Sequence, residues 1–299
     1  MSLAEMNCIK ARIAESFDPD ARFSVEGARR DWYVETGLEI VPEGMDVWEE
    51  QAGGPTLEGL ARQGVSRAAA VLYLHGGGYI CGSIASHRPL TVELAKTFEG
   101  VVWSLDYRLA PEHPFPAALD DALAAFDHIV ASGVDPASIA VAGDSAAGGL
   151  AVGVLIALRK RDVRAGVCWA ISPWADMRLR GETLRTLADK DPMVFPGTLE
   201  ASSVLYLAGH DVDTPEASPA FADLSDLPPL LIQVGSTEIL VDDAIALART
   251  AGLAGVEVRL EIWPDMIHVW HLFPNELEEA RRAVADASTW IQERLGAPR

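Results

Sequence analysis

The spacing of the hydrophobic positions changes along the chain, and these changes predict a series of helices and strands. Over residues 3–17 apolar side chains recur every three or four positions, as in an amphipathic helix, and residues 29–40 repeat the pattern more weakly. From residue 45 the spacing changes: DVWEEQ and TLEGLAR are predicted as strands joined by a Gly-Gly-Pro turn at residues 53–55. We therefore expect an N-terminal helical cap segment, residues 1–44, ahead of a sheet.

Five short apolar runs follow, each bounded by turn residues. Their length and lack of polar alternation are typical of strands buried on both faces of a parallel sheet. Helix-length segments lie between them, so right-handed crossovers are expected to place helices on both faces of an α/β fold. The runs are Ala69–Leu74, Val101–Leu105, Ile139–Ala142, Val167–Ile171 and Leu230–Val234, and the helical segments cover 86–98, 118–132, 145–160 and 241–254.

Two stretches depart from this alternation. Residues 174–227 form a connection far longer than a usual crossover, interrupted by several prolines, and we predict an inserted cap or lid there. It would divide the core into residues 45–173 and residues 228–299. The last strand, Glu257–Trp263, alternates charged and apolar residues, which is typical of an edge strand with one wet face, and an amphipathic helix at 275–295 closes the fold.

The composition is that of a globular protein, and its charge excludes several classes of partner. Of 299 residues, 49% are hydrophobic and 23% charged, which excludes a disordered, collagen-like or coiled-coil chain. Forty-four acidic residues against 24 basic ones give a formal net charge of −20. Such a field repels phosphate backbones and anionic membrane surfaces, so no nucleic-acid binding is expected.

Neither a membrane span nor a secretory signal is expected. No apolar stretch reaches about 18 residues, and the first residues lack a basic region followed by a continuous apolar one. The three cysteines, Cys8, Cys81 and Cys168, lie far apart in an odd number, which favours neither a disulfide framework nor a zinc site. We therefore predict a cytoplasmic protein.

The segment GDSAAGG, residues 143–149, carries the strongest chemical signal. It joins a predicted strand directly to a helix, and a serine in that position lies on a strained turn with its hydroxyl exposed. The segment departs from G-x-S-x-G only by an alanine at Ala147, with glycine one residue later. Ser145 is therefore a candidate nucleophile, although the motif alone also fits a small-residue turn at an ordinary helix start.

A glycine run, residues 76–78, follows His75 at the end of an earlier strand. Free backbone N–H groups in such a position can approach an oxyanion. Alone, this run also fits a flexible turn. Two such motifs in this order, on neighbouring strand ends, favour the chemical interpretation.

A hydroxyl nucleophile needs a base, and the base needs an orienting acid. Of seven histidines, His268 lies just after the edge strand, in a loop expected at the same face as Ser145, and His271 is its rival. No third ligand is spaced near this His-x-x-His pair, so no metal site is expected. The other histidines are expected to be structural, for His75 and His113, or on the surface, for His87, His128 and His210.

The candidate acids lie in VGSTEILVDD, after the strand at 230–234. They are Glu238, Asp242 and Asp243, and any of them gives the order Ser, acid, His of the α/β hydrolases. Asp242 is alternatively expected to stabilise the free amides at the start of the helix at 241–254.

Four segments together resemble the hormone-sensitive-lipase-like carboxylesterases of bacteria, a branch of the α/β hydrolases. They are HGGGY at 75–79, DYRLAPEHPFPAALDDA at 106–122, GDSAAGG and the terminal MIH that ends at His268. The resemblance covers roughly residues 71–273. It implies a mostly parallel, eight-stranded sheet flanked by helices, with a helical cap.

The resemblance also implies roles for individual residues. Ser145 would be the nucleophile and His268 the general base. Family members carry an aspartate in an Asp-Pro-Leu-x-Asp run where this chain has Glu238 first and Asp242 last, so Glu238 falls on the catalytic position. The oxyanion hole would consist of the amides of Gly76, Gly77 and Ala146.

We therefore predict a serine carboxylesterase that hydrolyses short- to medium-chain acyl esters of small molecules, with no metal or organic cofactor. Trp174, Phe195 and Tyr206 are expected either to line the acyl pocket or to hold the inserted segment on the core. The edge strand predicts a two-fold homodimer, and the alternative is that the charges of Glu257, Arg259 and Glu261 prevent such pairing.

Two alternatives stay open. One is another acyl hydrolase, such as a lactonase, amidase or peptidase, because the fold does not fix the leaving group. The other is a small-ligand receptor like the plant gibberellin receptors, which lack the histidine that this chain has at His268.

Overall fold

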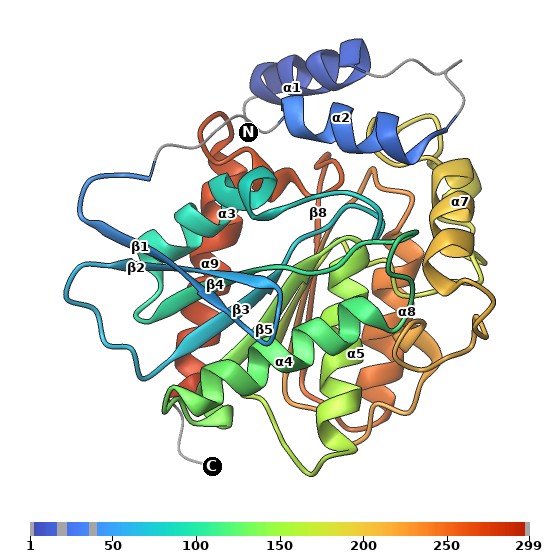
Figure 1. The fold of residues 1–299 in the computed structure, drawn as a ribbon. Coiled ribbons are helices and arrows are strands. Elements are labelled where there is room, and N and C mark those ends of the chain that lie inside the picture. Colours follow the sequence, from blue (N-terminus) through green and yellow to red (C-terminus); the bar gives the residue numbers. More distant parts are fainter. Residues whose placement is uncertain (1–2, 17–22, 36–40, 297–299) are drawn as a thin grey trace.

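The computed structural model describes residues 3–16, 23–35 and 41–296, and its eight strands form one sheet (Figure 1). The strand order is β1-β2-β4-β3-β5-β6-β7-β8. β2 runs antiparallel to both its neighbours and every other pairing is parallel, which confirms the expected mostly parallel sheet. The strands are β1 Met45–Gln51, β2 Thr56–Arg62, β3 Ala70–Leu74, β4 Val101–Asp106, β5 Ile139–Asp144, β6 Val167–Ile171, β7 Leu230–Gly235 and β8 Val258–Trp263.

Helices cover both faces of the sheet. On one face pack α3 Ile84–Thr97 and α9 Glu278–Leu295, and on the other α4 Ala117–Ala131, α5 Ala146–Arg159 and α8 Val241–Leu253 (Figure 1). In β3, Val71 and Tyr73 belong to the hydrophobic core of the first face, whereas Leu72 and Leu74 belong to that of the second. Both faces are dry, and for this reason the strand is a continuous apolar run.

The N-terminal residues form α1 Leu3–Ser16 and α2 Val25–Glu35, drawn toward the same end of the molecule as α7 (Figure 1). Met6, Ile9 and Ile13 of α1 are buried, as their spacing predicts. α2 begins four residues before the predicted start, and Phe17 and residues 36–40 lie outside the described residues.

The long connection after β6 contains two α-helices, α6 Thr183–Thr186 and α7 Pro196–Leu207, and a short 3₁₀ helix, Pro219–Phe221. None of the helices in the described part of the chain is long and apolar enough to cross a membrane.

β8 is the outer strand of the sheet, as expected, but its predicted alternation is wrong at two positions. Ile262 is 43% exposed, although its place in the pattern predicts burial. Glu261 is partly buried because its carboxylate accepts hydrogen bonds from the Gln233 amide at 2.8 Å and the Trp263 indole at 3.0 Å. These directional contacts override the hydrophobic pattern.

Candidate active site

Ser145 occupies the turn between β5 and α5. Its backbone angles, φ 55° and ψ −123°, lie where side chains other than glycine are rarely found, so the turn is strained. The Ser145 amide donates to the Ile171 carbonyl at 2.8 Å and so fixes the turn to β6. A Cβ at Gly143 would lie 2.3 Å from the Ala147 carbonyl oxygen. The small residues around Ser145 therefore follow from the contact between helix and strand.

Three side chains meet at this turn. The Nε2 atom of His268 lies 2.9 Å from the Ser145 hydroxyl, and its Nδ1 atom lies 2.8 Å from Oε2 of Glu238. Oε1 of Glu238 accepts from the Ser172 hydroxyl at 2.7 Å and the Gly235 amide at 2.6 Å. The chain thus brings together a hydroxyl, an imidazole and a carboxylate in the order that nucleophilic catalysis needs.

Burial and the pairing of the two groups set their protonation. Burial raises the pKa of the Glu238 carboxyl, although the hydrogen bond from His268 opposes this. Burial by itself would lower the pKa of His268, but the Glu238 carboxylate beside Nδ1 raises it above its ordinary value of 6.5. Nε2 of His268 is therefore a stronger base than a free imidazole.

His271, the alternative base, and Asp242, an alternative acid, bind other groups. Nε2 of His271 is 3.0 Å from the Gln233 side-chain oxygen, and burial lowers the His271 pKa to about 3. The Asp242 carboxylate accepts from the Thr183 amide at 2.9 Å, so it holds α6 against α8. Among the described residues no side chain caps α8, so the expectation that Asp242 binds the free amides of its own helix is wrong, although Asp242 does lie in the first turn, where a negative charge favours the helix dipole.

Asp243, the third candidate acid, also binds groups other than His268. Its carboxylate accepts from the Ala175 and Asp176 amides at 2.8 and 2.9 Å. Burial raises the Asp243 pKa to about 7. Asp243 therefore supports the start of the inserted segment.

The glycine loop contains one clear correction. The Gly76 amide donates to Oδ1 of Asp144 at 2.9 Å, so it is already occupied and the expectation that it serves the oxyanion hole is wrong. The amides of Gly77, Gly78 and Ala146 make no hydrogen bond to any other described residue. Gly77 at φ 117° and Gly78 at φ 61° adopt backbone conformations that favour glycine.

His87 is a buried neighbour of the serine turn, although the sequence interpretation expects it on the surface. It is buried, and its Nε2 atom lies 3.2 Å from Oδ2 of Asp144. Its spacing from Leu90 and Leu94 puts all three on one face of α3, and this periodicity could have identified it.

The other histidines match their predictions in part. His75, expected to be structural, is buried, and its ring stacks on that of Tyr107 with centroids 4.2 Å apart, whereas His113, also expected to be structural, is exposed. Of the other two expected on the surface, His210 is exposed and His128 is partly buried, with Nε2 2.6 Å from Oε2 of Glu50.

Trp174 and Tyr206 lie in the core around Tyr79. The Tyr79 and Tyr206 rings stack with centroids 3.6 Å apart, and the Trp174 ring lies 6.2 Å from Tyr79. Phe195 is half-buried at the start of α7. These contacts hold the inserted segment on the core, and a pocket role for the three residues stays a prediction.

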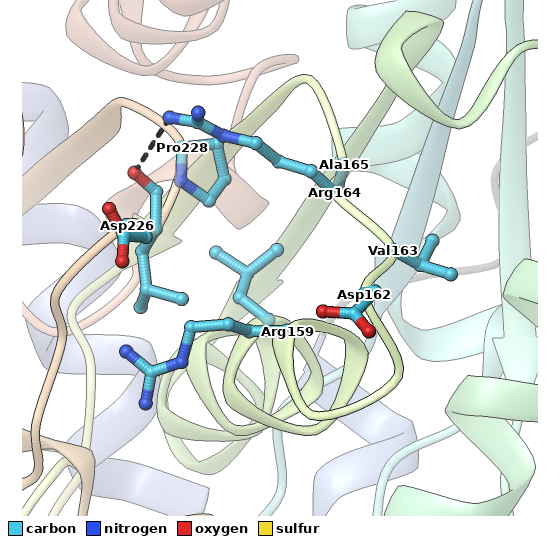
Figure 2. Close-up of a pocket in the computed structure, with 9 residues that line it drawn as sticks. Arg159, Asp162, Val163, Arg164, Ala165, Asp226 and Pro228 are labelled. Carbon is cyan, nitrogen blue, oxygen red and sulfur yellow. Dashed lines mark hydrogen bonds between the residues drawn. The ribbon is translucent and has the colours of Figure 1, made fainter.

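Two cavities among the described residues are lined by none of Ser145, His268 and Glu238. One, of about 240 Å³, is lined by Arg159 at the end of α5 and by the loop before β7, where Arg164 donates to the Leu227 carbonyl (Figure 2). At about 1.5 Å per residue, the length of α5 separates it from Ser145 by about 20 Å. The other, of about 380 Å³, lies between α8 and the inserted segment, beside Phe221 and Ile245.

Within the described ranges, no group of three or more His, Cys, Asp or Glu side chains has the arrangement of a metal site.

Comparison with known proteins gives consistent matches over most of the chain. A family described by its alpha/beta hydrolase fold matches residues 71–272. An acetyl-hydrolase of Streptomyces hygroscopicus is 45% identical over 229 residues, 76% of each chain. An esterase of Acinetobacter venetianus is 34% identical over 224 residues, 74% of each.

Solved structures match nearly end to end. An esterase from the bacterial hormone-sensitive lipase family superposes with a TM-score of 0.94 at 38% identity, over 99% of this chain and 100% of that one. The esterase EstE5, in a crystal soaked with p-nitrophenyl butyrate, superposes with a TM-score of 0.93 at 38% identity, over 98% and 99% of the two chains.

Proposed function

Because this chain belongs to the α/β-hydrolase fold family and is a carboxylesterase of its hormone-sensitive-lipase group, we propose that Ser145, His268 and Glu238 are its catalytic triad. The observation that carries the proposal is the pair of hydrogen bonds at His268, 2.9 Å to Ser145 and 2.8 Å to Glu238. All three side chains are largely shielded from water, so their mutual interactions are strong.

The reaction starts when Nε2 of His268 removes the proton of the Ser145 hydroxyl and Oγ attacks the ester carbonyl carbon. The tetrahedral intermediate collapses as the bond to the alcohol oxygen breaks, and His268 returns the proton to that oxygen. His268 then takes a proton from a water, whose oxygen attacks the acyl carbon. The bond from that carbon to Oγ of Ser145 breaks, His268 returns the proton to Oγ, and the carboxylic acid leaves. Throughout, Glu238 holds Nδ1–H and stabilises the imidazolium.

The negative oxygen of each intermediate needs donors that point to it beforehand. The amides of Gly77 and Ala146 keep the role expected from the sequence, and Gly78 takes the place of Gly76. The support for this exchange is that these three amides have no other partner among the described residues, whereas the Gly76 amide has one.

Residues 45–173 and 228–299 form the catalytic core in this proposal, and residues 1–44 and 174–227 form caps over it. Arg29 of α2 donates to the Ile80 carbonyl at 2.8 Å, next to the glycine loop. A Cβ at Gly78 would lie 3.0 Å from the hydroxyl of Ser202 on α7. Both contacts put cap residues at the rim of the site, and Trp174, Phe195 and Tyr206 are proposed to shape its acyl side.

Short- to medium-chain acyl esters of small molecules are the proposed substrates. One relative is named an acetyl-hydrolase, and the EstE5 crystal was soaked with a butyrate ester. Rates on matched p-nitrophenyl esters, anilides and lactones test this choice, because an amidase or lactonase would prefer the second or third class.

The triad is tested by replacing its members. Ser145→Ala should lower kcat on p-nitrophenyl butyrate by about 10⁵–10⁶ and abolish fluorophosphonate labelling, as when other triad nucleophiles are removed. His268→Ala should lose a comparable factor, while the matched control His271→Ala stays near the wild-type rate. A folded Ser145→Ala protein with a tenth of the activity would contradict the serine mechanism.

We also propose a two-fold homodimer through β8, whose outer edge has no strand partner in the described chain. The exposed Ile262 side chain supports it. A monomeric sedimentation profile at micromolar protein would contradict it.

A cytoplasmic location is proposed because Cys8, Cys81 and Cys168 are all free thiols. Cell fractionation tests it.

A further inference from the structure

Asp144 is a buried carboxylate that the reaction scheme leaves without a role. It is fully buried at the end of β5, one residue before Ser145. Burial alone would raise the pKa of this carboxyl, but the His87 ring and the Tyr73 hydroxyl hold it below its usual value. A buried charge is costly unless it is fully paired, so its partners indicate what it does.

The partners of Asp144 come from β3, the glycine loop and α3. Oδ1 accepts from the Tyr73 hydroxyl at 2.6 Å and from the Gly76 amide at 2.9 Å, and Oδ2 lies 3.2 Å from Nε2 of His87. A Cβ at Gly76 would lie 2.1 Å from Oδ2, so only glycine lets the loop approach the carboxylate this closely.

A second contact ties the same loop to the other side of Ser145. The Tyr79 hydroxyl donates to the Ala146 carbonyl at 2.8 Å. The residues immediately before and after Ser145 thus hold the two ends of the loop segment 76–79. The amides of Gly77 and Gly78, which have no partner in the described part of the chain, lie between these two anchors.

We propose that Asp144 is a positioning residue: by accepting the Gly76 amide, its carboxylate fixes the Gly77 and Gly78 amides relative to the Ser145 hydroxyl. This inference rests on the proposed oxyanion hole. Donors stabilise an oxyanion only when they are held in place before the reaction, and a run of three glycines has more backbone freedom than any other sequence. The anchor at Asp144 removes that freedom at the first glycine, where the amide lies 2.9 Å from Oδ1 of Asp144 and, at a longer 3.2 Å, from Nε2 of His87.

The first test compares three variants on p-nitrophenyl butyrate. Asp144→Ala should lower kcat by about 10- to 100-fold, less than the roughly 10²–10³ lost with a donor itself, and leave KM within about threefold. Asp144→Asn keeps an oxygen that can accept the Gly76 amide, so it should recover most of the rate. The matched control Tyr73→Phe removes a different donor from the same Oδ1 atom and should stay within about threefold of wild type.

The second test measures the affinity of an inhibitor that occupies the oxyanion hole. A trifluoromethyl ketone binds as a hemiketal whose oxyanion occupies the hole. Its affinity should therefore fall in Asp144→Ala by the same factor as kcat/KM, since transition-state analogues report interactions made in the transition state. A merely destabilised fold would lower the melting temperature and leave this affinity unchanged.

Gly76→Ala provides a variant that leaves Asp144 in place. Its methyl group must push the loop away from the carboxylate, so kcat and ketone affinity should both fall. In the double variant with Asp144→Ala the clash with the carboxylate is gone, and the second substitution should cost much less than it does alone.

Wild-type kcat and ketone affinity in folded Gly76→Ala, or in folded Asp144→Ala, would overturn the proposal. If Ser145→Ala kept its activity, the triad itself would be wrong, and that result is separate from these.

Discussion

Replacing Glu238 by glutamine tests the most specific feature of the site, the choice of acid. The substitution keeps the size of the side chain. The amide oxygen can still accept from the Ser172 hydroxyl and the Gly235 amide, which now bind Oε1 at 2.7 and 2.6 Å. The amide nitrogen then faces Nδ1 of His268, where Oε2 lies at 2.8 Å in the native protein.

This exchange reverses the hydrogen bond to the imidazole. An amide N–H donates, so Nδ1 of His268 must accept and the ring proton moves to Nε2. Nε2 then donates to the Ser145 hydroxyl and can no longer remove its proton. The corresponding change in a serine protease costs about 10⁴ in kcat, and we expect a loss of about 10³–10⁴, or roughly 4–5.5 kcal/mol of transition-state stabilisation.

The assay is kcat for p-nitrophenyl butyrate hydrolysis, with the fold checked by circular dichroism. Glu238→Asp should give an intermediate loss, because the arm is shorter by one methylene and the carboxylate no longer reaches Nδ1 without a loop shift. The matched control is Asp242→Asn, which changes a carboxylate one helical turn away and should lose less than about tenfold. Loss of turnover in Asp242→Asn with an active Glu238→Gln would refute the assignment of the acid.

Three further predictions follow from burial and pairing. The His268 pKa is raised above 6.5 by Glu238, so kcat/KM should fall on acidification with an apparent pKa above 6.5, and an acid limb below that value would contradict the pairing. Ala147 is fully buried at the contact of α5 with β5, where only small side chains fit. Ala147→Gly should therefore leave the free energy of unfolding nearly unchanged, whereas Ala147→Val should lower it by about 1–3 kcal/mol in denaturant unfolding. An unchanged free energy of unfolding in the valine variant would disprove this packing. Folded Asp243 binds a proton up to about pH 7, whereas the unfolded carboxyl releases it near 3.8, so its contribution to stability falls as pH rises between these values. The free energy of unfolding of Asp243→Asn should therefore decline less over this range, by up to about 1.4 kcal/mol per pH unit, and parallel curves for the two proteins would refute the assignment.

Much of the fold could be predicted because its signals are local. The parallel strands are continuous apolar runs, since both faces of the sheet are covered, and the helices between them keep helical spacing. The turn at Ser145 can also be predicted, because the close contact of α5 with β5 admits only small residues there.

The misassigned residues are polar groups whose partners lie far away in the sequence. Gly76 is bound by a carboxylate 68 positions later, and Asp242 by an amide 59 positions earlier. The prediction that His87 lies on the surface is wrong, and its helical spacing from Leu90 and Leu94 is the signal that indicates the buried face of α3.

The residues alone are enough to predict the order of the elements, the buried strands, the serine turn and the set of candidate acids and bases. The packing of distant segments was needed to show that Glu238 and His268 meet. It also shows that the Gly76 amide is already occupied, whereas those of Gly77 and Gly78 have no partner among the described residues. The reason is physical: hydrophobic burial depends on periodicity within one element and tolerates small shifts. A hydrogen bond depends on the distance and angle between two particular atoms, and for these groups both are set by how separate strands and loops pack.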